Sequence, residues 1–159
     1  MKLYLEKLVV KAIIIAKTIN QGVSGALCRR RNLNMDRRVV HTRHVLAVKD
    51  LDVETAYYLD KLGFERDFTA PGWEFLSFGM FKVMLGECAD EMTAEATGNH
   101  SWFAHALIEN VDEVYQEFTD RGATILSPIA SKPWNIREFS VVTPDGHRIV
   151  FGQLINNAI

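Results

Sequence analysis

The chain has 159 residues, of which 48% are apolar and 24% charged, so it is long enough and apolar enough to build a core without disulfides. The net charge of -2 is unevenly distributed, because residues 1–38 carry nine basic and two acidic residues whereas residues 39–159 carry nine basic and eighteen acidic ones. The acidic part argues against nucleic-acid binding. It favours either simple solubility or attraction of a cationic small ligand.

Residues 1–20 predict a helix, because their polar residues fall on one side of the helical wheel. Lys11 interrupts the apolar run, which is then too short to span a bilayer. We assign residues 1–38 to an N-terminal helix and a basic linker. Three roles stay open for this segment: docking on the domain or on a partner subunit, lying on a membrane surface, or extending the chain before a natural start at Met35.

The two cysteines, Cys28 and Cys88, are far apart in the sequence and form no metal-binding or redox pair. We expect free thiols that take no part in catalysis. Such thiols are typical of a reducing compartment, so the sequence favours the cytoplasm.

The first strand is expected at residues 39–48, where polar and apolar residues alternate. Asp52 is the expected N-cap of a helix that runs to about Leu62 and ends at Gly63. Three short strands separated by glycine-containing turns are predicted to follow, at residues 64–69, 73–78 and 81–86.

The same order of elements repeats later in the chain. A strand at 102–109 is followed by a helix that Gly122 ends, and then by strands at 123–126, 137–143 and 147–153. The last two form a hairpin around Pro144-Asp145-Gly146.

The two halves match at an offset of about 60 residues. We therefore predict an α+β fold of two tandem βαβββ modules, at 39–88 and 100–155, whose eight strands form an open cup. The predicted N-terminal helix is additional to this domain.

Alternation along the strands predicts which side chains turn inward to the cup and which lie under the helices. The inward set is Arg43, Met84, Phe103, His105 and Val150. Trp102 falls on the helix-covered side and is expected in the core.

Three stretches carry a family resemblance: HVLAVKDLDVETAYYLDKLGFERDF, SWFAHALIENVDEVYQEFTDRGA and PWNIREFSVVTPDGHRIVFGQ. Together they resemble the vicinal-oxygen-chelate superfamily, which includes glyoxalase I, fosfomycin-resistance proteins, extradiol dioxygenases and bleomycin-resistance proteins. The resemblance covers residues 39–155, and it is strongest to the bleomycin-resistance branch.

The metal-using branches place a His on the first strand, a Glu on the fourth, a His or Gln on the fifth and a Glu on the last. The resemblance puts those places on Arg43, Met84, Phe103 and Val150. Cationic, thioether and hydrocarbon side chains do not suit a hard or borderline divalent metal. We expect no metal and no cofactor, although a shift of two residues would offer a fallback pair, His41 and His105.

The resemblance to bleomycin-resistance proteins implies a homodimer that sequesters a cationic, partly aromatic drug at the subunit interface without modifying it. We therefore predict a metal-free small-molecule-binding protein rather than an enzyme. The expected ligand-binding residues are Arg43, Trp73, Met84, Phe103, His105, Trp134 and Glu138. Two alternatives stay open: a metal-dependent glyoxalase-like or dioxygenase-like enzyme with non-standard ligands, and an interaction protein whose cup is filled by its own side chains.

Individual side chains have competing roles. Trp73 and Trp134 follow turns and are placed to stack on a planar ligand at a cleft rim, or to pack in the core. Glu138 either binds a cationic group or pairs with Arg137 or Arg43. Three further histidines are expected to be solvated: His41, His100 and His147. The serines lack the sequence context of an activated nucleophile.

Overall fold

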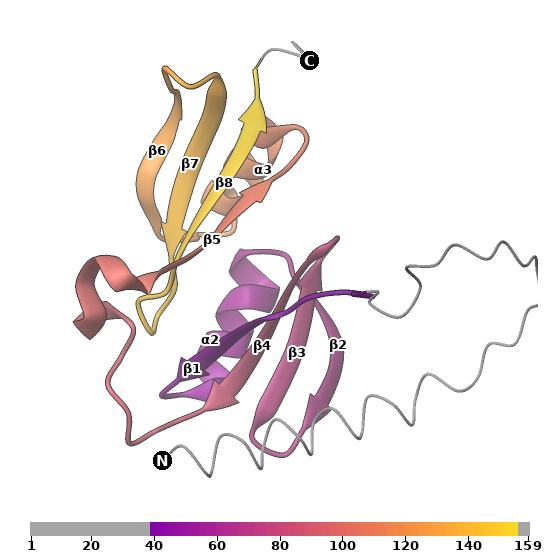
Figure 1. Ribbon diagram of the computed structural model, residues 1–159, viewed down its shortest axis with the longest axis vertical. Helices are drawn as coiled ribbons and strands as arrows, with labels where there is room; N and C mark the ends of the chain where they lie inside the picture. Colours follow the sequence, from indigo (N-terminus) through magenta and orange to yellow (C-terminus); the bar gives the residue numbers. More distant parts are fainter. Residues whose placement is uncertain (1–38, 156–159) are drawn as a thin grey trace, which may run out of the picture. The chain divides into compact units, whose positions relative to one another are not determined.

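The computed structural model describes residues 39–155, so the predicted N-terminal helix and its basic linker, residues 1–38, lie outside the described residues. Two four-stranded sheets, each with one α-helix, account for this part of the chain (Figure 1). The predicted α+β fold of two tandem βαβββ modules is confirmed. The eight strands form two separate sheets of four.

The first sheet has the strand order β1-β4-β3-β2, with β1 parallel to β4 and the other pairs antiparallel. Its module consists of β1 (His44–Val48), α2 (Leu51–Ala56), the π-helical turn η2 (Tyr57–Lys61), β2 (Glu65–Ala70), β3 (Trp73–Phe78) and β4 (Phe81–Glu87).

The second sheet repeats this topology in the order β5-β8-β7-β6, with β5 parallel to β8. Its elements are the 3-10 segment η3 (Glu95–Ser101), β5 (Trp102–Leu107), α3 (Val111–Asp120), β6 (Ile125–Ser131), β7 (Ile136–Val142) and β8 (Arg148–Leu154).

Capping side chains and glycines set the ends of the helices, and one predicted cap is wrong. The N-cap of α2 is Asp50 rather than Asp52, because the Asp50 carboxylate accepts a hydrogen bond from the main-chain N–H of Val53 at 3.0 Å. Gly63 and Gly122 follow their helices with φ of +63° and +77°, a left-handed conformation that favours glycine, as predicted.

Each helix covers one face of its own sheet (Figure 1). Buried residues of both modules form one hydrophobic core. Aromatic rings meet across the modules: the centroids of Phe78 and Phe118 lie 6.1 Å apart, and those of Phe81 and Phe151 lie 6.2 Å apart. The shared core therefore ties the two halves together and leaves the opposite face of each sheet open.

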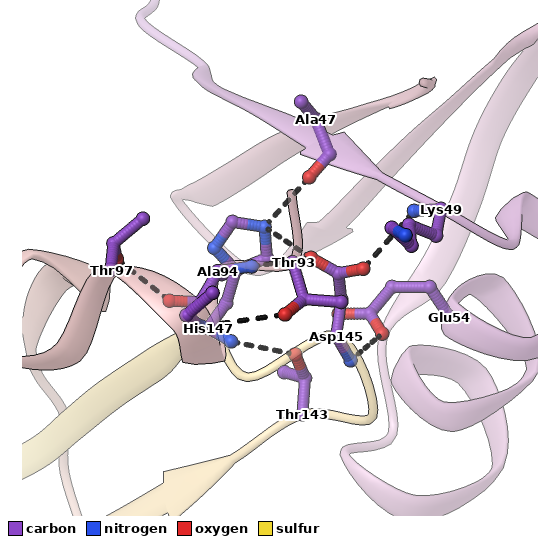
Figure 2. A network of polar contacts seen from close by, with 10 residues as sticks. Ala47, Lys49, Glu54, Thr93, Ala94, Thr97, Thr143, Asp145 and His147 are labelled. Atoms are coloured by element: carbon purple, nitrogen blue, oxygen red, sulfur yellow. Dashed lines mark hydrogen bonds and ion pairs between the residues drawn. The ribbon is translucent and has the colours of Figure 1, made fainter. Parts of the chain in front are cut away.

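A polar network also connects the modules, and Figure 2 shows its members. The turn between β7 and β8 places Asp145 beside Glu54 of α2, and the main-chain N–H of Asp145 donates to Glu54 Oε2 at 3.0 Å. His147 was predicted to be solvated, which is wrong: it is buried, and its Nε2 lies 3.0 Å from the carbonyl oxygen of Ala47. The expected solvation of His41 and His100 agrees with their exposure.

Within residues 39–155, no helix has the length and apolar character needed to cross a membrane.

Candidate ligand-binding site

The open face of the first sheet is largely covered by its own side chains. Strand pairing places Val45, Met84, Phe75 and Phe68 in one row across the sheet, and the Phe68 and Phe75 rings stack at 3.9 Å. Met84, predicted to face the cup, lies on this face and is buried by its neighbours.

Trp73 lies flat against the same sheet, over Gly86. A Cβ atom at Gly86 would be 2.5 Å from the Trp73 ring, so only glycine permits this packing. Only 8% of Trp73 is exposed. Trp73 therefore packs on its own sheet and does not project from a cleft rim.

Arg43 is held firmly at the edge of this face. Its guanidinium is 2.6 Å from the Asp67 carboxylate, it donates to the carbonyl oxygens of Leu76 and Val83, and it lies 5.5 Å from the centroid of the Phe75 ring. The positive charge predicted for this position is real, but Asp67 neutralises it.

The surroundings of Asp67 keep its carboxyl ionised as the partner of Arg43. Partial burial alone raises the pKa of its carboxyl, but hydrogen bonds from Arg43 and Ser77, with the charges of Arg43 and Lys82, hold that pKa below its usual value. Asp67 is the extra residue of an irregularity in β2 between Arg66 and Phe68. This irregularity turns its carboxylate toward Arg43.

The open face of the second sheet is more polar. Register pairs His105 with Val150, Val150 with Ser140, and Ser140 with Ser127, so these side chains form one row across all four strands. Val150 and His105 therefore lie on the open face, as predicted. His105 Nε2 approaches Glu138 Oε2 to 3.5 Å.

Gly152 makes this approach of His105 to Glu138 possible. A Cβ there would lie 3.1 Å from His105 Nε2 and 3.3 Å from the Cβ of Glu138. Because these contacts are tighter than ordinary van der Waals distances, a side chain at Gly152 would push the two residues apart.

A bulge in β5 changes the predicted faces of Trp102 and Phe103. Trp102 pairs with Arg148, whereas Ala104 pairs with the next residue, Ile149, so one residue of β5 is unmatched. The prediction that Trp102 lies in the core is wrong: it shares the open face with Arg148, whose guanidinium lies 5.5 Å from its ring, and it is 40% exposed.

The prediction that Phe103 turns into the cup beside His105 is also wrong. As the unmatched residue of the bulge, its ring packs at the junction of the modules, with centroids 5.5 Å from His44 and 5.7 Å from His147. It lines a separate hollow of about 300 Å³ between β1 and the segment that connects the modules.

A pocket of about 220 Å³ opens on the second sheet. It is lined by Trp102, Ser127, Lys132, Glu138, Phe139, Ser140 and Val150. A pocket of this size takes one ring with its substituents but is smaller than typical sites for drug-sized ligands, which have about 300–1,000 Å³.

Glu138 is available to this pocket, because the structural pairings predicted for it do not form. Arg137 pairs with Asp112 at 2.6 Å and Arg43 pairs with Asp67, so neither arginine takes the Glu138 carboxylate. Trp134 lies in the turn between β6 and β7 and is 60% exposed, so it does not pack in the core.

The strand positions that hold metal ligands in the metal-using branches do not fit a metal here. Arg43 is already ion-paired, Met84 is buried among aromatic rings, and Phe103 and Val150 offer no lone pair. Across residues 39–155, no three His, Cys, Asp or Glu side chains come together in a group that could hold a metal ion. The fallback residue His105 contacts Glu138, a pair of two possible ligands rather than a complete set.

Comparison with protein families gives one decisive match. The model of the Glyoxalase/Bleomycin resistance protein/Dioxygenase superfamily matches residues 38–151. The chain belongs to this superfamily. It resembles a bleomycin resistance protein of Geobacillus stearothermophilus and one of Staphylococcus aureus, each 31% identical over 127 residues that cover 70% of this chain and 95% of the relative.

Two solved structures share the fold of this chain. TioX from Micromonospora sp. ML1 is 26% identical with a TM-score of 0.58, covering 71% of this chain and 94% of TioX. A bleomycin-binding protein from Streptomyces verticillus, solved with copper(II)-bleomycin, is 19% identical with a TM-score of 0.58, covering 72% and 96% of the two chains.

The sequence did not predict four of the residues that line the pocket on the second sheet: Trp102, Ser127, Lys132 and Ser140. Ser140 and Ser127 belong to the second sheet's open face, and the two-residue period from Glu138 was a sufficient signal for Ser140. Trp102 carried no such signal, because its face depends on the bulge at Phe103. Lys132 lies directly after β6 and lines the pocket, and the alternation of the strands carried no signal for a residue outside them.

Proposed function

We propose that this protein binds and sequesters a small molecule of the antibiotic type without changing it chemically. The observation that carries the proposal is the chemistry of the four strand positions at which metal-using members hold their ion. Arg43, ion-paired at 2.6 Å to Asp67, replaces the first of these ligands, and the other three are apolar or thioether side chains. Without a Lewis acid, glyoxalase or dioxygenase chemistry has no electrophile to drive it.

The similarity to bleomycin resistance proteins supports the proposal that this protein binds a small molecule. The described part of the chain is also acidic, with eighteen acidic and nine basic residues in 39–155. Such a charge attracts a cationic ligand at long range. We therefore propose a cationic, partly aromatic ligand, and bleomycin is the natural first probe.

We also propose that the ligand cleft is completed by a second copy of the chain. The open face of the first sheet is filled by its own side chains, and the pocket on the second sheet has only about 220 Å³. Apolar side chains nevertheless remain exposed around these faces, among them Val45, Leu107 and Leu154. Two copies that cover these residues would enclose a larger cleft between a first and a second sheet.

The cytoplasmic location remains a prediction that rests on the cysteine usage. In the described part of the chain, Cys88 is a free thiol, and burial raises its pKa, which makes it less reactive.

Calorimetric titration of the full chain with metal-free bleomycin tests the proposal, together with elemental analysis of protein purified without chelator. We expect saturable binding by protein that carries background levels of Zn, Ni, Mn and Fe. Stoichiometric metal in the purified protein would contradict the metal-free account. Sedimentation analysis should give twice the chain mass of 18.0 kDa, and a monomer that binds bleomycin fully would overturn the shared cleft.

A further inference from the structure

The pocket on the second sheet has a polar atom that the protein leaves unsatisfied. Ser140 is 3% exposed, and its hydroxyl has no hydrogen-bond partner within the part of the chain that the structure describes. Unsatisfied buried hydroxyls are uncommon and costly. Because Ser140 also lines the pocket, a bound group is placed to satisfy it.

The Glu138 carboxylate is the second polar group at the same place, and it remains partly open to solvent. It is 16% exposed, and its contact among residues 39–155 is the 3.5 Å approach of His105 Nε2, which is too long for a strong hydrogen bond. Glu138 and Ser140 are two residues apart on β7 and project from the same face. Together they offer one carboxylate acceptor and one hydroxyl to a ligand.

The charges that line this pocket balance. Glu138 is its negative residue and Lys132, directly after β6, is its positive one. A purely cationic group would meet the repulsion of Lys132, and a purely anionic group would meet that of Glu138. A group that donates on one side and accepts on the other satisfies both residues without a net charge of its own.

Trp102 sets the shape of this group. The bulge in β5 turns the indole to the open face, where it lines the pocket. Arg148 lies against the Trp102 ring and donates to Asn99 Oδ1 at 3.2 Å, so it braces the indole. A flat ring can therefore stack on a side chain that is already ordered.

We propose that this pocket binds a flat, uncharged group that carries an N–H donor next to a lone-pair acceptor, such as a carboxamide-bearing or amino-substituted nitrogen heterocycle. The N–H donates to Glu138, the acceptor receives hydrogen bonds from Ser140 and Lys132, and the ring stacks on Trp102. The inference rests on the proposed function, because this group is one part of the sequestered ligand. The long-range attraction of the acidic protein for cations acts on the rest of that ligand.

Nuclear magnetic resonance titration of the full chain tests the assignment. The probes are pyridine-3-carboxamide, benzylammonium and benzoate, and the signal is the indole N–H of Trp102. We expect the carboxamide to shift this signal saturably and the two charged probes to bind at least fivefold more weakly. Equal or stronger binding of either charged probe would overturn the proposal.

Variants show which side chains hold the carboxamide. Ser140→Ala should weaken its binding about fivefold and Glu138→Gln about tenfold, as expected for the loss of one neutral and one charge-assisted hydrogen bond. Ser131→Ala is the matched control from the same sheet, and it should leave the affinity unchanged. Unchanged affinity in Ser140→Ala, which removes an unpartnered hydroxyl and should fold normally, would overturn the proposal even if Glu138→Gln is unstable.

Bleomycin titrated into the same samples separates the two claims. If bleomycin binds the wild type while the carboxamide does not, the pocket assignment is wrong and the sequestration function stands. If neither binds, the pocket assignment and the proposed function both fail. If bleomycin displaces the carboxamide, the pocket is part of the sequestration site.

Discussion

The main-chain N–H of Asp145 donates to Oε2 of Glu54 at 3.0 Å, across 91 positions of the sequence. This bond connects the β7–β8 turn of the second module to α2 of the first (Figure 2). Glu54 is 1% exposed, and its other oxygen has no partner within residues 39–155. Burial raises the pKa of the Glu54 carboxyl to about 7, although the nearby Thr143 side chain and the main-chain N–H of Asp145 lower it; the Asp145 charge acts in the same direction as burial.

The pH dependence of stability should reveal this carboxyl. Its pKa is raised from 4.5 in the unfolded chain to about 7 in the folded one, so the folded protein binds more protons between these values. The free energy of unfolding contributed by Glu54 should fall as pH rises through that window, by about 3 kcal/mol in total. Glu54→Gln should abolish this fall and be more stable than the wild type at pH 8, measured by urea unfolding.

Glu113→Gln provides the matched control, because Glu113 is an exposed residue of the other helix. Its unfolding free energy should follow that of the wild type at every pH. A Glu54→Gln variant whose stability runs parallel to the wild type from pH 5 to pH 8 would show that Glu54 does not titrate in this window.

Replacing Asp145 should lower the free energy of unfolding more than most other substitutions. Its carboxylate accepts hydrogen bonds from the main-chain N–H groups of Lys49 at 3.1 Å and Ala94 at 2.9 Å, and it is buried. Asp145→Ala leaves both groups unsatisfied, so we expect a loss of about 2–5 kcal/mol in chemical denaturation.

Asp145→Asn tests whether the acceptors matter more than the charge. It keeps one acceptor oxygen and the shape of the side chain, so its loss should be clearly smaller than that of Asp145→Ala. Equal losses in the two variants would contradict this expectation, because they would mean that shape and one acceptor oxygen are not enough and that both carboxylate oxygens are needed.

The sequence predicted the modules well because their pattern is local and repeated. Strands β3 and β4 begin at the predicted residues, and Gly63 and Gly122 end their helices as expected. These features depend on alternation and on glycine conformations, both of which are visible in one short stretch of sequence.

The errors occur where tertiary contacts override local pattern. Alternation assigned Trp102 and Phe103 to the wrong faces, because a single unmatched residue in β5 inverts the parity on one side of it. His147 looked like a solvated residue after a turn, yet it is buried against Ala47 of the other module. Neither a bulge nor a partner 100 positions away leaves a signal in one sequence.

The Arg43–Asp67 pair should be energetically coupled. The side chains are 14% and 24% exposed, and the ion pair measures 2.6 Å. Replacing either partner alone removes this short ion pair and leaves the other partly buried charge with weaker partners, so Arg43→Met and Asp67→Asn should each destabilise the protein by about 1–3 kcal/mol. In a double-mutant cycle, the double variant should lose at least 1 kcal/mol less than the sum of the single losses.

The exposed pair Arg121–Glu117, also close at 2.7 Å, is the control for this cycle. Its coupling should be below about 0.5 kcal/mol, because both side chains are solvated. Coupling of the same small size in the Arg43–Asp67 pair would mean that this ion pair contributes little to stability and does not fix the side chains on the open face of the first sheet.

Gly152→Ala should disturb both stability and binding. The added Cβ would lie 2.8 Å from Cγ2 of Ile136 as well as against His105 and Glu138, which implies overpacking of about 1–3 kcal/mol. Displacing Glu138 should also weaken ligand binding in calorimetry. A variant with wild-type stability and wild-type affinity would show that the close approach of His105 and Glu138 has no role.

The most direct measurement follows the ligand itself. Bleomycin is incubated in tenfold excess with the full-length protein. The protein is then denatured and removed by filtration, and the mass of the recovered bleomycin is measured by mass spectrometry. The account predicts that all of the bleomycin is recovered with unchanged mass, and that no more than a stoichiometric amount is retained before denaturation. Conversion of more than one bleomycin molecule per chain into a product of altered mass would contradict sequestration and establish an enzyme.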